Sequence, residues 1–206
     1  MEAIKEVCVE SFSEAVDAVK GGATRIELCE NLTVGGTTPS FGTIKQCLHT
    51  LPVPVMVMIR PRGGNFCYSS SEIEIMKEDI AVCKSLGVYG VVFGVLTSSS
   101  EVDIAVTAEL VQLAKPMQIT FHKAIDEAPD LLIATTLVRA MGIDRILSSG
   151  GKATAAEGAE TLRQMIALAG PHTRIIVAGK VTHENLDQIA AAIPSSDYHG
   201  RRLVAF

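Results

Sequence analysis

The sequence predicts an α/β protein in which eight parallel strands and their helices form a (β/α)8 TIM barrel, as a single domain over residues 1–206. Strand-like apolar runs recur eight times and alternate with helix-like stretches, the pattern of repeated βαβ units. The turn after the first run reads "ESFSEA" and lacks the GxGxxG glycines that often mark a doubly wound sheet. No linker or low-complexity segment divides the chain.

The predicted strands are short aliphatic runs at Ile4–Val9, Arg25–Cys29, Val53–Ile59, Gly90–Leu96, Met117–His122, Arg145–Ser148, Arg174–Ala178 and Asp197–His199. The predicted helices between them cover Ser13–Val19, Phe41–His49, Ile73–Ser85, Asp103–Ala114, Pro129–Met141, Ala155–Leu168 and His183–Ala192. Capping boxes of the form S/T-x-x-E predict helix starts at Ser11, Ser71, Ser98 and Thr154. The barrel is lean, because such domains typically have about 250 residues. The chain ends soon after the eighth strand, so we expect the last helix to be short or missing, or a neighbouring subunit to cap the barrel there.

Composition narrows the classes of function. Of the 206 residues 48% are hydrophobic, and the net charge is −5 without a basic block, which argues against nucleic acid as a partner. The N-terminus lacks the pattern of a signal peptide and no apolar stretch reaches about 18 residues, so we expect a cytoplasmic protein without a membrane span. The five cysteines are scattered and form no CxxC, which indicates reduced thiols.

Strand parity predicts an ionisable barrel interior. In a TIM barrel alternate residues of each strand face inward, and the site forms at the carboxyl ends of the strands. On four of the strands the inward-facing residues are largely polar or ionisable, while the outward-facing residues are apolar. The inward residues are Glu6, Cys8 and Glu10 on the first strand, Arg25, Glu27 and Cys29 on the second, Met56, Met58 and Arg60 on the third, and Gln118, Thr120 and His122 on the fifth. Burying such groups is costly, so a functional site at the barrel mouth is the favoured interpretation. A buried ion-pair network that only fixes the fold is the alternative.

The loops after several strands add further candidates. His122 ends the fifth strand as a possible general base, metal ligand or hydrogen-bond partner, and Lys123 and Asp126 follow it in "TFHKAID". Arg60 and Arg62 in "RPRGGN" suit an anion such as carboxylate or phosphate, or lie in a solvated turn. The glycine-rich "SSGG" after the sixth strand, which includes Ser149 and Gly150, and "AGK" after the seventh can each face an anion. The Walker A spacing is absent, and no nucleotide cofactor is expected.

Sulfur chemistry offers a rival interpretation. Cys8 and Cys29 lie on neighbouring strands with inward parity, and Met56 and Met58 lie on the next strand. Soft sulfur ligands suit Cu(I). The alternative is that these side chains only fill core space, which is the commonest use of buried Cys and Met.

The motifs, taken together and in order, resemble the CutC family, named for copper homeostasis. They are "EVCVES" (6–11), "RIELCENLTVGGTTPS" (25–40), "VMIRPRGGNFCYS" (57–69), "EIEIMKEDI" (72–80), "GVVFGVL" (90–96), "TFHKAID" (120–126), "DRILSSGG" (144–151) and "YHGRR" (198–202). The resemblance implies a cytoplasmic TIM barrel that binds Cu(I) in copper handling and forms homodimers or higher homo-oligomers. Its shared polar positions fall on Glu10, Arg25, Glu27, Cys29, Arg60, Arg62, His122, Asp126, Ser149 and His199. Lys123 departs from the family, whose members commonly carry Arg there.

Two functional hypotheses follow. In the first, the chain is a Cu(I)-binding copper homeostasis protein with Cys29 and Cys8 as metal ligands. In the second, it is a TIM-barrel enzyme of unidentified reaction that acts on a small carboxylate or phosphate. Its catalytic residues would be Glu27, His122, Asp126 and Lys123, and its substrate-binding residues Glu10, Arg25, Arg60, Arg62, Ser149, Gly150 and His199. A catalytically inactive oligomeric scaffold is the third possibility.

Overall fold

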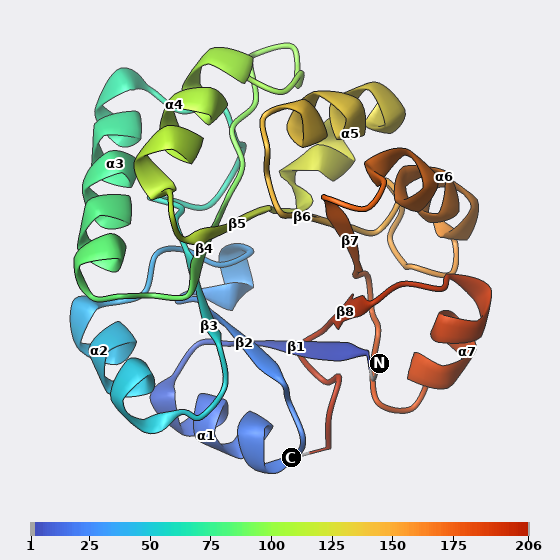
Figure 1. Cartoon of the computed structure of the whole chain (residues 1–206), viewed down its shortest axis with the longest axis horizontal. Helices are drawn as coiled ribbons and strands as arrows, with labels where there is room; N and C mark the ends of the chain where they lie inside the picture. The colour runs from blue at the N-terminus through green and yellow to red at the C-terminus, as the bar shows by residue number, and fades with distance from the viewer. Residues whose placement is uncertain (1–2, 206) are drawn as a thin grey trace.

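The computed structural model describes residues 3–205, and within them eight parallel strands close into a barrel. The strands pair in sequence order, and β8 pairs with β1 to complete the ring (Figure 1). They are β1 (Ile4–Val9), β2 (Arg25–Leu28), β3 (Val55–Met58), β4 (Gly90–Phe93), β5 (Gln118–Phe121), β6 (Arg145–Ser148), β7 (Arg174–Val177) and β8 (Asp197–His199). The predicted (β/α)8 barrel is confirmed, with several strands shorter than their apolar runs.

Seven α-helices within residues 3–205 surround the strands. They are α1 (Phe12–Lys20), α2 (Phe41–Thr50), α3 (Ser70–Ser85), α4 (Ile104–Ala114), α5 (Leu131–Ala140), α6 (Ala159–Ala169) and α7 (Leu186–Ala192). Two 3-10 helices, η1 (Leu32–Val34) and η2 (Lys123–Glu127), lie in the loops after β2 and β5. No helix in this part of the chain is long and apolar enough to cross a membrane.

Three of the four helix starts predicted from capping boxes are displaced. Ser11 caps α1 as predicted, but the box of α3 begins at Ser69, and α4 is capped by Asp103. Thr154 and Glu157 do exchange hydrogen bonds, yet they do so in a turn that precedes α6. An S/T-x-x-E pair closes one turn of chain, and it forms whether or not a helix continues from that turn.

No eighth helix follows β8 among the described residues, in line with the prediction of a short or missing one. The segment after β8 packs instead against the end of α1. Val204 is buried there, and a Cβ at Gly21 would lie 2.6 Å from the Ala205 carbonyl oxygen, so only glycine fits. A parallel bridge between Thr182 and Arg202 ties this segment to the loop after β7.

The alternation of each strand sorts its side chains between two layers. Ile26 and Phe121 point outward and join the large core between the sheet and the helices. Cys29 and Met56 point inward and belong to a small separate cluster inside the barrel. Gly90 leaves room for that cluster, because a Cβ there would lie 2.6 Å from the Met56 sulfur. The predicted parity is therefore confirmed.

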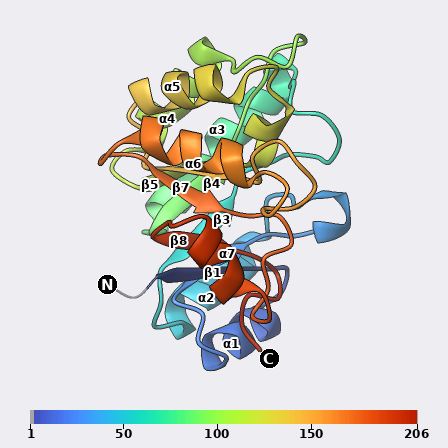
Figure 2. The ribbon, with the colours of Figure 1, turned by 90° about the vertical axis from the view of Figure 1, so that its right-hand side faces the viewer.

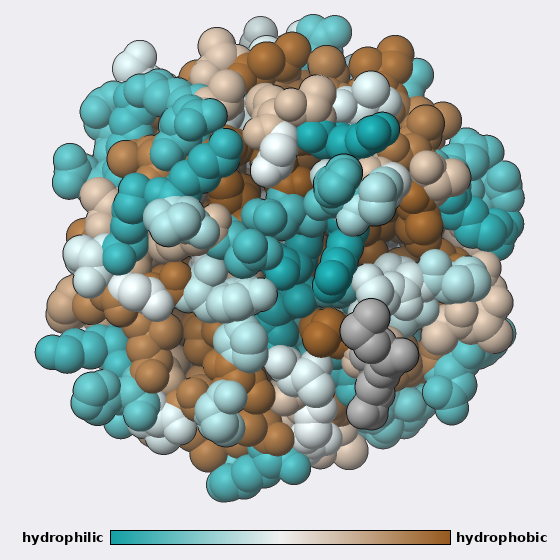
Figure 3. Space-filling view, viewed as in Figure 1, coloured by the Kyte–Doolittle hydropathy of each residue, from teal (hydrophilic) through white to brown (hydrophobic). Residues whose placement is uncertain are grey.

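Buried charges occupy the amino-terminal part of the barrel interior. The start of β1 lies on the side that faces the viewer in Figure 1, as the turned view in Figure 2 shows, and hydrophilic side chains gather over the centre of this face in Figure 3. Arg25 opens β2 and donates from Nε to Glu6 at 2.5 Å and from Nη2 to Asp197 at 2.6 Å. All three residues are at most 3% exposed. Arg25 thus lies away from the mouth and donates to two carboxylates of its own chain, a geometry that does not favour its predicted role in substrate binding.

We expect Arg25→Met to reduce the free energy of unfolding by roughly 3–5 kcal/mol, because it removes the guanidinium that donates to the buried carboxylates of Glu6 and Asp197. Arg174→Met is the matched control: its side chain is 55% exposed and lies 3.8 Å from the same Asp197. The control should change stability by less than about 1 kcal/mol in urea denaturation. Equal effects of the two substitutions would contradict the structural role of Arg25.

Candidate functional site

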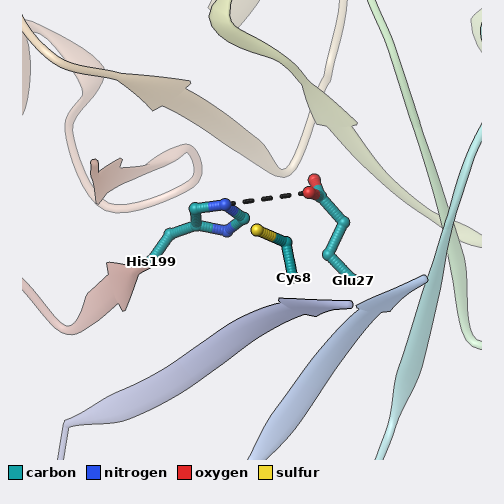
Figure 4. A group of neighbouring side chains, drawn as sticks. All are labelled: Cys8, Glu27 and His199. Atoms are coloured by element: carbon teal, nitrogen blue, oxygen red, sulfur yellow. Dashed lines mark ion pairs between the residues drawn. The ribbon is translucent and has the colours of Figure 1, made fainter. Parts of the chain in front are cut away.

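Three side chains from adjacent strands come together inside the barrel. Cys8 on β1 and Glu27 on β2 are register partners, and His199 on β8 is the register partner of Glu6, two residues before Cys8. One potential ligand atom from each of Cys8, Glu27 and His199 lies within 4.8 Å of the other two (Figure 4). We call these three residues the ligand group. Two ligands of one metal ion with bonds of roughly 2.0–2.3 Å lie no more than about 4.6 Å apart. The 3.7 Å between His199 Nε2 and Glu27 Oε2 falls within that limit.

Glu6 fixes the orientation of the His199 ring. Its Oε1 atom lies 2.8 Å from His199 Nδ1, so Nε2 is directed toward Glu27, with Oε2 of that residue 3.7 Å away. Burial acts to raise the pKa of Glu6, but Arg25 and His199 outweigh it and lower that pKa to about 2. An ionised Glu6 accepts the Nδ1 proton and leaves Nε2 available as a ligand atom. A carboxylate behind a histidine is the usual outer-shell arrangement of a metal-binding imidazole.

The ligand group holds exchangeable protons near neutral pH. Burial, helped by the nearby Glu6 charge, raises the pKa of Glu27 to about 7 against the opposing charge of His199. Burial lowers the pKa of His199, but Glu27 and Cys8 outweigh it and hold that pKa well above its ordinary value. The Glu27 Oε1 atom is buried and has no hydrogen-bond partner among residues 3–205. An unpartnered buried oxygen is costly, and a bound cation would satisfy it.

Cys29 lies next to the ligand group without belonging to it. Its thiol donates to Glu27 Oε2 at 3.6 Å, and the side chain is fully buried. Burial, and after it the charge of Glu27, raises the pKa of the Cys29 thiol well above its ordinary value. Of the two cysteines predicted as metal ligands, Cys8 is therefore in the group and Cys29 reaches it through Glu27.

His122 lies at the end of β5 as predicted, but its environment limits its chemistry. The ring is 4% exposed, its Nδ1 atom accepts from the Ala124 amide at 3.2 Å, and its centroid lies 4.8 Å from that of Phe66. Burial, and after it the Arg60 charge, lowers the pKa of His122 to about 3. The neutral ring therefore carries its proton on Nε2, which has no partner among the described residues. His122 is placed to donate a hydrogen bond, and a general-base role is not favoured.

The glycine-rich loop after β6 binds to Asp126 and offers no free anion site. The Asp126 carboxylate accepts from the Ser148 hydroxyl and from the amides of Ser149 and Gly151, and it pairs with Lys123 at 2.5 Å. The Gly150 amide donates to the Ser148 hydroxyl. The amides of Ser149 and Gly151 thus face a carboxylate of the same chain, an arrangement that does not favour the predicted binding of a substrate anion at this loop.

The two arginines of "RPRGGN" also bind their own loops. Arg60 donates to the carbonyl oxygens of Val34, Gly36 and Gly64, and its guanidinium lies 4.7 Å from the centre of the Phe66 ring. Arg62 pairs with Glu72 at 2.6 Å and donates to the carbonyl oxygens of Gly63, Asn65 and Cys67. This arrangement does not favour the predicted anion site, because most of the guanidinium donors already bind carbonyl oxygens or Glu72. Glu10, likewise, accepts from the Leu32 amide at 3.2 Å.

Two cavities lead from the ligand group toward solvent. Cys8 lines one of about 280 Å³ together with Glu14 and His183. His199 lines another of about 580 Å³ together with Lys123 and Lys180. Arg201 and Arg202 line both cavities. The sequence analysis named neither arginine nor Lys180 as a site residue, although "YHGRR" and "AGK" contain them.

Comparison with known proteins shows the family. A model of the CutC family matches residues 3–203. The chain belongs to the CutC family. Relatives named copper homeostasis protein cutC homolog from Mus musculus and Homo sapiens are 41% and 40% identical over 95% of this chain and 72% of their own length. A CutC family protein from Chromobacterium violaceum is 42% identical over 97% of this chain and 81% of its own length.

Solved structures agree with this assignment. The crystal structure of a CutC protein from Streptococcus agalactiae has a TM-score of 0.92 at 35% identity, and the match covers 98% of this chain and all of that one. A thiamine phosphate pyrophosphorylase from Pyrococcus furiosus has a TM-score of 0.62 at 13% identity, over 96% of this chain and 84% of that one. The second likeness shows the barrel fold alone.

Arg60→Lys should lower the free energy of unfolding by roughly 2–4 kcal/mol, because lysine keeps the charge but cannot reach three carbonyl oxygens with one planar fork. Arg139→Lys is the control, since Arg139 makes one exposed bond to the Leu168 carbonyl oxygen. Urea denaturation measures both. If Arg60→Lys leaves stability unchanged, the assignment of Arg60 as a loop anchor is wrong.

Proposed function

We propose that this CutC family member binds Cu(I) inside its barrel and takes part in copper handling in the cytoplasm. The observation that carries the proposal is the ligand group, in which a thiol, a carboxylate and an imidazole converge within 4.8 Å. The names of the mouse and human relatives supply the connection to copper. The five cysteines are free, as suits a reducing compartment.

The ligand group suits a soft cation best when a second sulfur atom, that of Cys29, is added to it. Cys8 supplies a thiolate and His199 an imidazole, both of which bind copper, whereas the Glu27 carboxylate is a harder ligand. Cys29 Sγ is 3.6 Å from Glu27 Oε2, so Cys29 is the residue that would supply a second thiolate to a bound Cu(I). The same set without Cys29 suits Zn²⁺, and the choice of metal therefore depends on whether Cys29 joins the site.

The homodimer or higher homo-oligomer that the family resemblance implies stays a prediction. Light scattering on the purified chain measures the mass directly. The ligand group itself is supplied by one chain, since β1, β2 and β8 of that chain carry all three residues. Copper binding is therefore expected whatever the oligomeric state.

A Cu(I) titration against a chromophoric chelator under anaerobic conditions tests the proposal. We expect one equivalent to bind to the wild type, and Cys8→Ser or His199→Gln to weaken the binding at least tenfold, equivalent to about 1.4 kcal/mol. Cys29→Ser should weaken Cu(I) binding more than Zn²⁺ binding. Cys83→Ala is the control, because Cys83 lies on α3 in the outer core. If Cys8→Ser binds Cu(I) as tightly as the wild type, the assignment of the ligand group as the Cu(I) site is wrong.

The affinity for Cu(I) should fall as the pH falls. The pKa of Glu27 is raised to about 7 and that of His199 well above its ordinary value, so protons compete with the ion for both groups. Each proton that the ion displaces weakens the binding by up to about tenfold per pH unit. Competition titrations should therefore show that the affinity for Cu(I) falls at least tenfold from pH 8 to pH 6. In Glu27→Gln the affinity should depend less steeply on pH. Affinity independent of pH over this range would contradict the site.

A further inference from the structure

The larger of the two cavities beside the ligand group is lined by cations. Lys123 comes from the loop after β5, Lys180 from the loop after β7, and Arg201 and Arg202 from the segment after β8. We call this space of about 580 Å³ the basic cavity. No aspartate or glutamate is among its lining residues, although acidic residues outnumber basic ones by 23 to 18 in the whole chain. This local excess of positive charge is opposite in sign to the net charge of the chain, which is −5.

Two of these four cations have no carboxylate to balance them. Lys123 pairs with Asp126 at 2.5 Å, and Arg201 lies 3.8 Å from Glu10, beyond hydrogen-bond distance. Lys180 and Arg202 have no carboxylate oxygen within 4.0 Å among residues 3–205. Like charges held around one cavity repel each other, and a bound anion removes that cost.

The backbone holds these cations in place. Lys180 has a φ of 56°, in the left-handed region that costs a lysine about 1 kcal/mol. The preceding Gly179 has no room for a side chain, because a Cβ would lie 2.7 Å from the Ser149 Cβ and 2.9 Å from the Ala155 nitrogen. The backbone of Arg202 is tied to the same loop, because its carbonyl oxygen accepts from the His183 amide at 2.9 Å and it forms a parallel bridge with Thr182. The backbones that carry both unbalanced charges therefore belong to ordered segments packed against the barrel.

At two other predicted anion sites most of the hydrogen-bond donors already have partners in the same chain. Arg60 and Arg62 give their guanidinium donors to carbonyl oxygens and to Glu72, and the amides of the loop after β6 donate to Asp126 and Ser148. Arg60 Nε is the exception, since it is buried without a partner among residues 3–205, whereas Lys180 and Arg202 have no carboxylate oxygen within 4.0 Å in the same part of the chain. Arginine forks bind two oxygens of a phosphate or carboxylate, and lysine adds a point charge.

We propose that the basic cavity binds a small dianion through a phosphate or a pair of carboxylates, next to the metal-binding ligand group. The volume of about 580 Å³ holds a molecule larger than inorganic phosphate. His199 forms a wall of this cavity and belongs to the ligand group as well, so the anion lies beside the metal. If the chain is an enzyme, the cavity holds the anionic group of its substrate. The proposal does not depend on copper, because Lys180 and Arg202 are outside the ligand group.

Isothermal titration of the metal-free full chain with inorganic phosphate and with malonate, at ionic strength fixed with chloride, tests the proposal. We expect saturable binding, and at least a tenfold weaker affinity when Lys180→Gln and Arg202→Gln are combined. Both side chains are exposed, so the double variant should fold, which circular dichroism checks. Lys45→Gln on α2 is the charge-matched control, with an exposed side chain outside the basic cavity.

The outcomes distinguish a phosphorylated ligand from a dicarboxylate, and they distinguish binding in the basic cavity from binding at the ligand group. Tighter binding of phosphate than of malonate assigns a phosphorylated ligand, and the reverse assigns a dicarboxylate. Cys8→Ser should bind the anion as the wild type does, and the double variant should keep its Cu(I) affinity within about threefold. Absence of saturable binding up to about 10 mM of either anion, or equal affinity in the double variant and the wild type, would overturn the proposal.

Discussion

The site depends on one ion pair at the seam where the barrel closes. Arg25 on β2 holds Glu6 of β1 and Asp197 of β8, and so joins the three strands from which the ligand group projects. A buried pair of this kind adds little net stability, because desolvation offsets most of the attraction. Its effect here is positional: it keeps Glu6 ionised, and Glu6 in turn directs the His199 ring toward Cys8 and Glu27.

Strand periodicity made the barrel and its inward faces predictable. Cys8 and Glu27 share inward parity on neighbouring strands, and the structure places them side by side. His199 could not be assigned to the same group from the sequence, because its strand has three residues and its register against β1 exists only once the barrel closes. The sequence analysis accordingly placed His199 with the substrate-binding residues and did not group it with Cys8 and Glu27.

The loops were harder to predict, for a physical reason. Arg60 and the amides near Ser149 have hydrogen-bond donors that suit an anion. The sequence alone does not show which acceptor each donor binds. In the structure a carbonyl oxygen or a carboxylate of the same chain reaches them first, because loops over a barrel need internal partners to be ordered. Lys180 and Arg202 show the reverse case, since within residues 3–205 neither has a carboxylate oxygen within 4.0 Å. The sequence pointed to the "AGK" segment of Lys180 as an anion candidate but gave no such sign for Arg202.

X-ray absorption at the copper edge of the Cu(I)-loaded chain tests the central claim most directly. If Glu6 and Arg25 orient His199 toward Cys8, the spectrum contains the multiple-scattering signal of one imidazole together with at least one sulfur ligand. That imidazole signal should disappear in His199→Gln while copper remains bound through sulfur. A wild-type copper shell of sulfur alone, without imidazole, would contradict the account, because the ion would then sit among Cys29 and the methionines and not in the ligand group.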